Sequence, residues 1–184
     1  MDKFKEFKAL VEKHSGLSVK ILRSNRGGEY KSNEFLEYCR YHGIKKQFTT
    51  CYTPQQNGFA ERKNHGIMEM ERSMLKGKNL SNEYWVEAVA CAIYILNRSA
   101  TKIVRDMVPQ EAWSGKHHSV SHFKIFGCIA YAHIPKQTRS KLDDKSEKCI
   151  FIGYDEQSKE YKLFNPRTNK VIVSRDVVFK EEES

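Results

Sequence analysis

The hydrophobic positions in the first half of the chain recur mostly at helical spacing, with two strand-like runs between them. The apolar positions of the first segment are Phe4, Phe7, Leu10 and Val11. Because a spacing of three or four residues marks one helix face, it predicts a helix over residues 3–14 that Gly16 ends. Similar patterns and turn signals predict helices over residues 33–41, 58–76 and 81–97 and strands over residues 18–24 and 44–50.

Beyond residue 120 the chain changes to short β-rich runs separated by turn residues. These runs cover residues 124–133, 149–154, 161–164, 171–174 and 177–179. Five strands in so short a stretch predict a small β-barrel or sandwich. Residues 99–120 interrupt both patterns and predict a connector with one brief helical turn at Pro109. The acidic end, residues 181–183, is expected to be a frayed tail.

The cysteines and the apolar runs limit the class of protein. No apolar run approaches the ~18 residues of a membrane span, and the start MDKFKEFK is not typical of a signal peptide. The sequence therefore predicts no membrane partner. The five cysteines are widely spaced and form no CxxC pair, which excludes a zinc knuckle and a disulfide framework. They are expected to be buried small hydrophobes of an intracellular protein, in the nucleus or the cytoplasm.

The positive charge is concentrated in the first part of the chain. The net charge is +9, and residues 1–80 contain 16 Lys and Arg against 9 Asp and Glu, a balance of +7. Residues 139–184 contain 10 of each. A polyanionic partner such as DNA is one interpretation of this asymmetry. A soluble protein that is basic for no functional reason is the other.

One stretch, LRSNRGGEY at residues 22–30, places a polar side chain at the end of a predicted strand. α/β folds position catalytic carboxylates there, but this chain has the neutral amide of Asn25. Taken alone, Asn25 before Arg-Gly-Gly is a turn residue. Glu61 follows after 35 intervening residues, in the first turn of a predicted helix, where the helix dipole favours an acid. An acidic position at a strand end and a second on a helix that follows are the layout of polynucleotidyl transferases.

Four segments together carry a specific resemblance. They are LRSNRGGEY, FLEYCRYHGIKKQFTTCYTPQQNGFAERKN, EYWVEAVACAIYILNR and KSEKCIFIGY. Nearly the whole chain resembles the integrase of copia-type LTR retrotransposons. The resemblance implies an α/β fold, with a truncated ribonuclease-H-like integrase core over residues 1–98. It also implies a connector over residues 99–120 and a small all-β barrel domain over residues 121–180.

The resemblance assigns catalytic roles to two positions. In the family the strand end bears an aspartate at the position of Asn25, and the helix glutamate matches Glu61. Two Mg²⁺ or Mn²⁺ ions hold the reacting phosphodiester, and such ions need charged oxygen ligands. No segment here matches the family's first aspartate, and Asn25 replaces the second. Glu61 is then the only carboxylate of three, so we expect no stably bound metal.

The expected DNA contacts are basic side chains around these positions. They are Arg26, Lys45, Lys46, Arg62, Lys63 and His65, which stands where the family usually has a basic residue. The alternative for each is an ordinary exposed base. Three histidines, His117, His118 and His122, superficially suggest a metal site. Because no acid or cysteine is evident near them, we interpret them as not binding metal.

Three functional hypotheses remain open from the sequence. The first is a catalytically silent segment of an enzyme that carries out metal-dependent DNA strand transfer in the intact family. The second is a retained, non-enzymatic nucleic-acid-binding or assembly module, with a homo-oligomer as a possible form. The third is an enzyme completed in trans by another subunit. The neutral side chain at Asn25 argues against catalysis but does not bear on binding.

Overall fold

The protein was analysed as a computed structural model that describes residues 1–25, 27–49, 58–102, 104–135, 139–141, 144–155, 158 and 160–183. The chain divides into two compact units, Met1–Asn64 and His65–Ser184. The boundary between them falls within one helix, α3 (Gly58–Gly77).

The first unit begins with α1 (Asp2–Ser15), which ends at Gly16 as the sequence predicts. Gly16 has φ 68°, a left-handed conformation that closes a helix without steric cost to glycine. The strand predicted over residues 18–24 is shorter, β1 (Ile21–Ser24). The physical reason is that residues before it serve the turn: the Val19 N–H donates to Glu12 Oε1 at 2.7 Å.

The remaining elements of this unit are η1 (Gly28–Tyr30), α2 (Asn33–Tyr41) and β2 (Lys45–Phe48). Ser32 caps α2, because its Oγ accepts a hydrogen bond from the Phe35 N–H at 3.3 Å. β1 and β2 pair in parallel, which requires a crossover such as the one that α2 provides. The core of the unit is small and centres on Phe35, Cys39 and Ile44.

The apolar face of α1 is largely uncovered. The helix has no buried residue, and Phe7 and Leu10 are 60% and 65% exposed. On β1, Ile21 is 53% exposed. The periodicity of residues 3–14 thus predicts the helix correctly, but most of its apolar side chains have no core to enter in this unit.

The second unit contains the rest of α3, then η3 (Asn82–Tyr84), α4 (Trp85–Asn97) and α5 (Pro109–Ser114). The helical turn predicted at Pro109 is therefore present. Within the described part of the chain, no helix is both long and apolar enough to cross a membrane.

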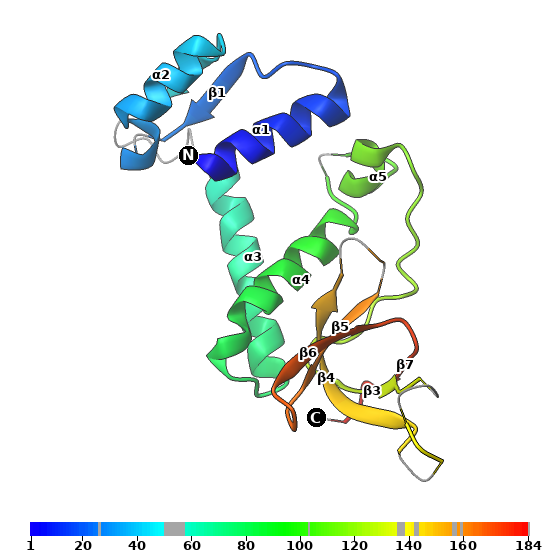
Figure 1. Cartoon of the computed structure of the whole chain (residues 1–184). Coiled ribbons are helices and arrows are strands. Elements are labelled where there is room, and N and C mark those ends of the chain that lie inside the picture. The colour runs from blue at the N-terminus through cyan, green and yellow to red at the C-terminus, as the bar shows by residue number, and fades with distance from the viewer. Residues whose placement is uncertain are drawn as a thin grey trace. The chain divides into compact units, whose positions relative to one another are not determined.

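Five strands follow and form one antiparallel sheet (Figure 1). They are β3 (Ile129–His133), β4 (Ser146–Tyr154), β5 (Tyr161–Asn165), β6 (Lys170–Ser174) and β7 (Val177–Lys180). Their order is β6-β5-β4-β3-β7, with an irregularity in register between Phe151 and Gly153 of β4. The predicted order of an α/β part followed by an all-β part is confirmed.

Two strand bounds differ from the prediction. The strand predicted over residues 124–133 starts only at Ile129, because Gly127 forms a turn with φ 81°. A Cβ at Gly127 would lie 2.7 Å from Leu80 Cδ1 and 2.9 Å from Lys78 Cβ, so the loop after α3 packs against bare backbone here. The strand predicted over residues 149–154 begins earlier, at Ser146, where it pairs with β3.

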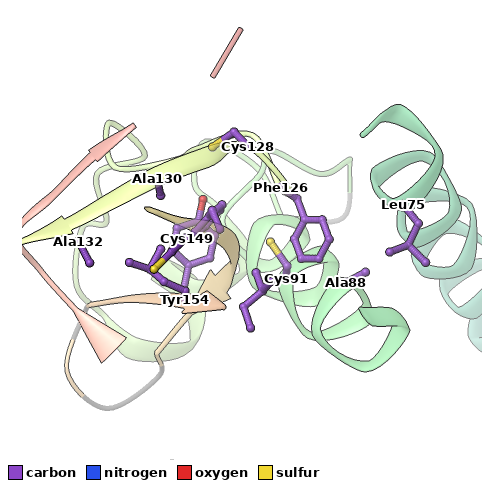
Figure 2. Packing of buried hydrophobic residues seen from close by; sticks show 12 residues of the cluster. Leu75, Ala88, Cys91, Phe126, Cys128, Ala130, Ala132, Cys149 and Tyr154 are labelled. Carbon is purple, nitrogen blue, oxygen red and sulfur yellow. The ribbon is translucent and has the colours of Figure 1, made fainter. Parts of the chain in front are cut away.

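The core of the second unit lies between α4 and the sheet. Figure 2 shows Cys91 of α4 on the side of the helix toward Cys149 and Tyr154 of the sheet, and Ala88 on the side toward Leu75 of α3. Phe151 is fully buried, and its ring contacts those of Tyr154, Tyr161 and Phe179. The predicted domains, a core over residues 1–98, a connector over 99–120 and a barrel over 121–180, remain a prediction. The compact units follow a different division, since α4 shares its core with the sheet.

The acidic end is not a frayed tail, contrary to expectation. Lys78 Nζ donates to the carbonyl oxygens of Glu181 and Glu183 at 3.0 and 3.1 Å. The Glu181 carboxylate accepts from Lys124 Nζ at 3.0 Å and from the Ile125 N–H at 3.2 Å. The Lys124 hydrogen bond holds the pKa of Glu181 below its ordinary value. These bonds fix residues 181–183 to the turn after α3 and to the segment before β3.

We predict that Ala88→Leu destabilises the protein by about 1–3 kcal/mol, because Ala88 is completely buried and the added carbons have no space. Ala90→Leu is the matched control on the same helix: Ala90 is exposed, so its change should stay within about 0.5 kcal/mol. Urea denaturation followed by circular dichroism measures both. Equal effects of the two substitutions would show that Ala88 is not part of the buried core.

Candidate nucleic-acid interface

Asn25 follows directly after β1 and is exposed. Its side-chain Oδ1 accepts a hydrogen bond from the Gly27 N–H at 3.0 Å. This bond from a side chain to the backbone two residues on is an Asx turn, which an aspartate forms equally well. Asn25 thus has a structural role in this turn, and its side chain is neutral.

Lys46 lies on β2, opposite Leu22 of β1. Its amino group donates to the Tyr30 carbonyl oxygen in η1. The same Nζ lies 4.6 Å from the centre of the Phe35 ring and 4.7 Å from that of Phe48, so the two rings provide cation–π contacts. Lys46 is half-buried and joins the loop after Asn25 to the core of the unit. Its predicted DNA contact would have to compete with these interactions.

Lys45 differs from its neighbour because its side chain is exposed. It pairs with Ile21 in the parallel β1–β2 register. The structure therefore brings Lys45 and Lys46 beside the strand that leads to Asn25. Arg26, the remaining predicted contact in this loop, lies outside the described residues.

A second basic group lies in the first turns of α3. Glu61, Arg62 and Lys63 are all exposed, and Glu61 occupies the first turn, where the helix dipole stabilises its charge. A Cβ at Gly58 would lie 3.0 Å from Arg62 Nη1, so the guanidinium folds back over the start of the helix. The segment that precedes this helix, including Cys51, lies outside the described residues.

His65 begins the second unit and is also exposed. Its Nε2 lies 3.1 Å from Glu69 Oε1, one turn further along α3. Gly66 follows within the helix, and a Cβ there would meet no atom within 4 Å. His65 is therefore part of a solvated i,i+4 pair, which protonation of the imidazole would strengthen.

The described residues contain no group of three or more His, Cys, Asp or Glu side chains that could hold a metal ion. The integrase resemblance assigns two positions to catalysis, Asn25 and Glu61. Asn25 has a neutral amide whose oxygen accepts the Gly27 N–H, and Glu61 has a carboxylate. Two divalent ions need several charged oxygens, so this donor set does not fit them.

The interpretation of the connector histidines needs one correction, because an acid does lie beside them. Glu111 Oε1 is 2.6 Å from His117 Nδ1 and accepts the His118 N–H at 2.9 Å, while Oε2 accepts the Val108 N–H at 3.2 Å. The amide of His118, then that of Val108, hold the pKa of Glu111 below its ordinary value. His122 is placed elsewhere, with its Nε2 3.0 Å from the Tyr94 hydroxyl.

Comparison with known proteins identifies the family. Over 180 residues, 98% of this chain, the sequence is 51% identical to the retrovirus-related Pol polyprotein from transposon TNT 1-94 of Nicotiana tabacum. The chain belongs to the retrovirus-related Pol polyproteins of copia-type transposons. A second Pol polyprotein, from transposon RE2 of Arabidopsis thaliana, is 33% identical over 180 residues, also 98% of the chain. This Pol segment spans only 14% and 12% of these two relatives.

Residues 128–184 of the Pol segment match the retroviral polymerase SH3-like domain. This match coincides with the antiparallel sheet β3–β7 and agrees with the small barrel predicted from the sequence. A solved HTLV-2 integrase catalytic core domain in complex with magnesium is 21% identical and covers 60% of this chain and 64% of that one, with a TM-score of 0.43. The homology to the transposon Pol polyproteins confirms, at the level of the family, the resemblance found in the sequence.

The sequence of the Pol segment did not reveal several side chains that form hydrogen bonds with backbone groups. Glu111 three residues after Val108 is the spacing by which a glutamate reaches back to the start of a short helix, and it could have been recognised from the sequence. The bond from Lys46 to the Tyr30 carbonyl and those from Lys78 to the chain end join residues distant in sequence. No local pattern indicates them.

Proposed function

We propose that this Pol segment is an integrase segment that binds DNA and does not catalyse strand transfer. Its homology to transposon Pol polyproteins supports the integrase origin. The observation that carries the loss of catalysis is Asn25, whose amide occupies the position of the family's aspartate and is engaged by Gly27. We place its action inside the cell, in the nucleus or the cytoplasm, where a DNA target would be found.

The loss of one charge matters because of what divalent ions require. A carboxylate offers two oxygens that share a negative charge, whereas the amide of Asn25 offers one neutral oxygen. That oxygen already accepts a hydrogen bond, which directs one of its lone pairs toward the backbone. With a neutral amide at position 25, the Mg²⁺- or Mn²⁺-dependent chemistry of the family lacks one of its charged ligands.

DNA binding needs no metal and rests on different residues. The side chains of Lys45, Arg62 and Lys63 are exposed, so each can reach a phosphate without leaving a buried position. Residues 1–80 have a charge balance of +7. Contacts of this kind are not sequence-specific and release condensed counterions, so affinity depends steeply on salt.

A specific observation favours one alternative, a non-enzymatic assembly module. Phe7, Leu10 and Ile21 expose more than half of their surface on α1 and β1. Apolar side chains gathered on one small unit are typical of surfaces that another chain covers. Self-association into a homo-oligomer is the form that this alternative would take, and it is compatible with DNA binding.

Replacing three of the exposed bases should weaken DNA binding and reduce its salt dependence. We expect Lys45→Gln/Arg62→Gln/Lys63→Gln to lower the slope of log K against log salt for duplex DNA by up to about 2.7, since each phosphate contact contributes about 0.9. The matched control is Lys148→Gln/Lys170→Gln/Lys180→Gln, which removes three exposed charges from the sheet. Fluorescence anisotropy at several salt concentrations measures the slope. If the control lowers it as much, or the parent shows no salt dependence, the proposed interface is wrong.

Asn25→Asp should tighten Mn²⁺ binding without producing strand transfer. The aspartate can keep the bond to the Gly27 N–H and adds one charge, enough with Glu61 for a single ion but not for two. Isothermal titration with MnCl₂ and a DNA strand-transfer assay test the two parts. Asn25→Ser, which adds no charge, is the control. Strand transfer by the parent chain that disappears in Glu61→Gln would contradict the proposed loss of catalysis.

A further inference from the structure

The connector between α4 and β3 lines a surface cavity, open to solvent, that the proposed interface does not use. Its volume is about 570 Å³, within the range of small-molecule sites. One part of its wall is apolar and consists of Ala100, Val104, Met107, Val108 and Val120. All of these residues belong to the second unit, so the cavity is contained within one compact body.

Three cationic side chains, Arg98, Lys102 and Arg105, line the same cavity. Arg98 is held in place, because its guanidinium carbon lies 3.6 Å from the centre of the Tyr94 ring and its Nη1 donates to the Tyr94 carbonyl oxygen at 3.2 Å. Tyr94 in turn stacks on the buried Tyr154, with ring centres 4.3 Å apart and planes at 17°. A planar cation fixed on a stacked ring is thus present before any ligand binds.

Two acids also line the cavity, Asp106 and Glu111. The charge of Glu111 is largely compensated, because the carboxylate accepts two backbone N–H groups and contacts His117. Lys102 and Arg105 are exposed, and no ion pair joins them to an acid in the described part of the chain. The lining therefore combines an apolar wall with cations that have unused hydrogen-bond donors.

We propose that this cavity takes one nucleotide of single-stranded DNA, with the base against the apolar wall and its phosphates at Arg98, Lys102 and Arg105. The apolar wall complements the face of a base, and the cations complement phosphate oxygens. A base paired within a duplex cannot enter a concave site, so the ligand is an unpaired strand. The inference deepens the proposed DNA binding and rests on it, but it uses residues other than Lys45, Arg62 and Lys63.

The test uses the full chain with a 12-nucleotide single strand and with a duplex closed at both ends by hairpin loops of non-nucleotide linker. Lys102→Gln/Arg105→Gln should lower the salt slope for the single strand by about 1.4, at about 0.7 for each phosphate contact, and leave that for the closed duplex unchanged. Lys170→Gln/Lys180→Gln removes the same charge from exposed positions on the sheet and should change neither slope. Photocrosslinking of a strand containing 5-iodouracil should label residues within 98–120.

The outcomes separate this inference from the proposed function. If Lys102→Gln/Arg105→Gln and Lys170→Gln/Lys180→Gln change the single-strand salt slope equally, the cavity does not hold an unpaired nucleotide. The same follows if Lys102→Gln/Arg105→Gln lowers the slope for the closed duplex as much as that for the single strand. In that case duplex binding that still depends on Lys45, Arg62 and Lys63 leaves the proposed function intact. If the parent chain binds neither DNA, both proposals fail. Crosslinks confined to residues outside 98–120 would also overturn the cavity assignment.

Discussion

The packing of α4 against β4 is the contact on which the second unit, His65–Ser184, depends. The helix lies close to the sheet at Cys91, since a Cβ at Gly153 of β4 would be 3.9 Å from Cys91 Cβ, and Ala88 and Phe151 belong to the same buried cluster. Burial raises the pKa of the Cys91 thiol to about 12, so it stays a neutral core group. Arg98 follows directly after this helix, so the position of α4 also fixes the stacked guanidinium that lines the connector cavity.

The first unit has a smaller hydrophobic core than the second among the described residues. Among the described residues its core is small, with Phe35, Cys39 and Ile44 buried and a few partly buried side chains packed against them. The polar contacts of Asn25 and Lys46 organise the loop after β1 in their place. The hydrogen bond from the Gly27 N–H needs only a side-chain oxygen at position 25, so asparagine and aspartate can form the same turn and differ there in charge.

The helices and the order of an α/β part before an all-β part could be predicted, because periodicity and turn residues encode them locally. Gly16 marked the end of the first helix correctly for the same reason. The sharing of a core between α4 and the sheet could not, since it depends on side chains that lie far apart in sequence. Of the candidate site, the positions Asn25 and Glu61 came from the resemblance, and the residues could not reveal that Lys46 is held between Phe35 and Phe48.

The central claim is that Asn25 is a turn residue at a position without metal affinity. Paramagnetic broadening by Mn²⁺ in the ¹⁵N-labelled parent chain tests it most directly, because each amide reports its own distance from a bound ion. The account predicts no broadening centred on residues 25 and 61 at low equivalents of Mn²⁺, with only weak, scattered effects near exposed acids. Selective loss of the amide signals of both Asn25 and Glu61 at substoichiometric Mn²⁺ would contradict it.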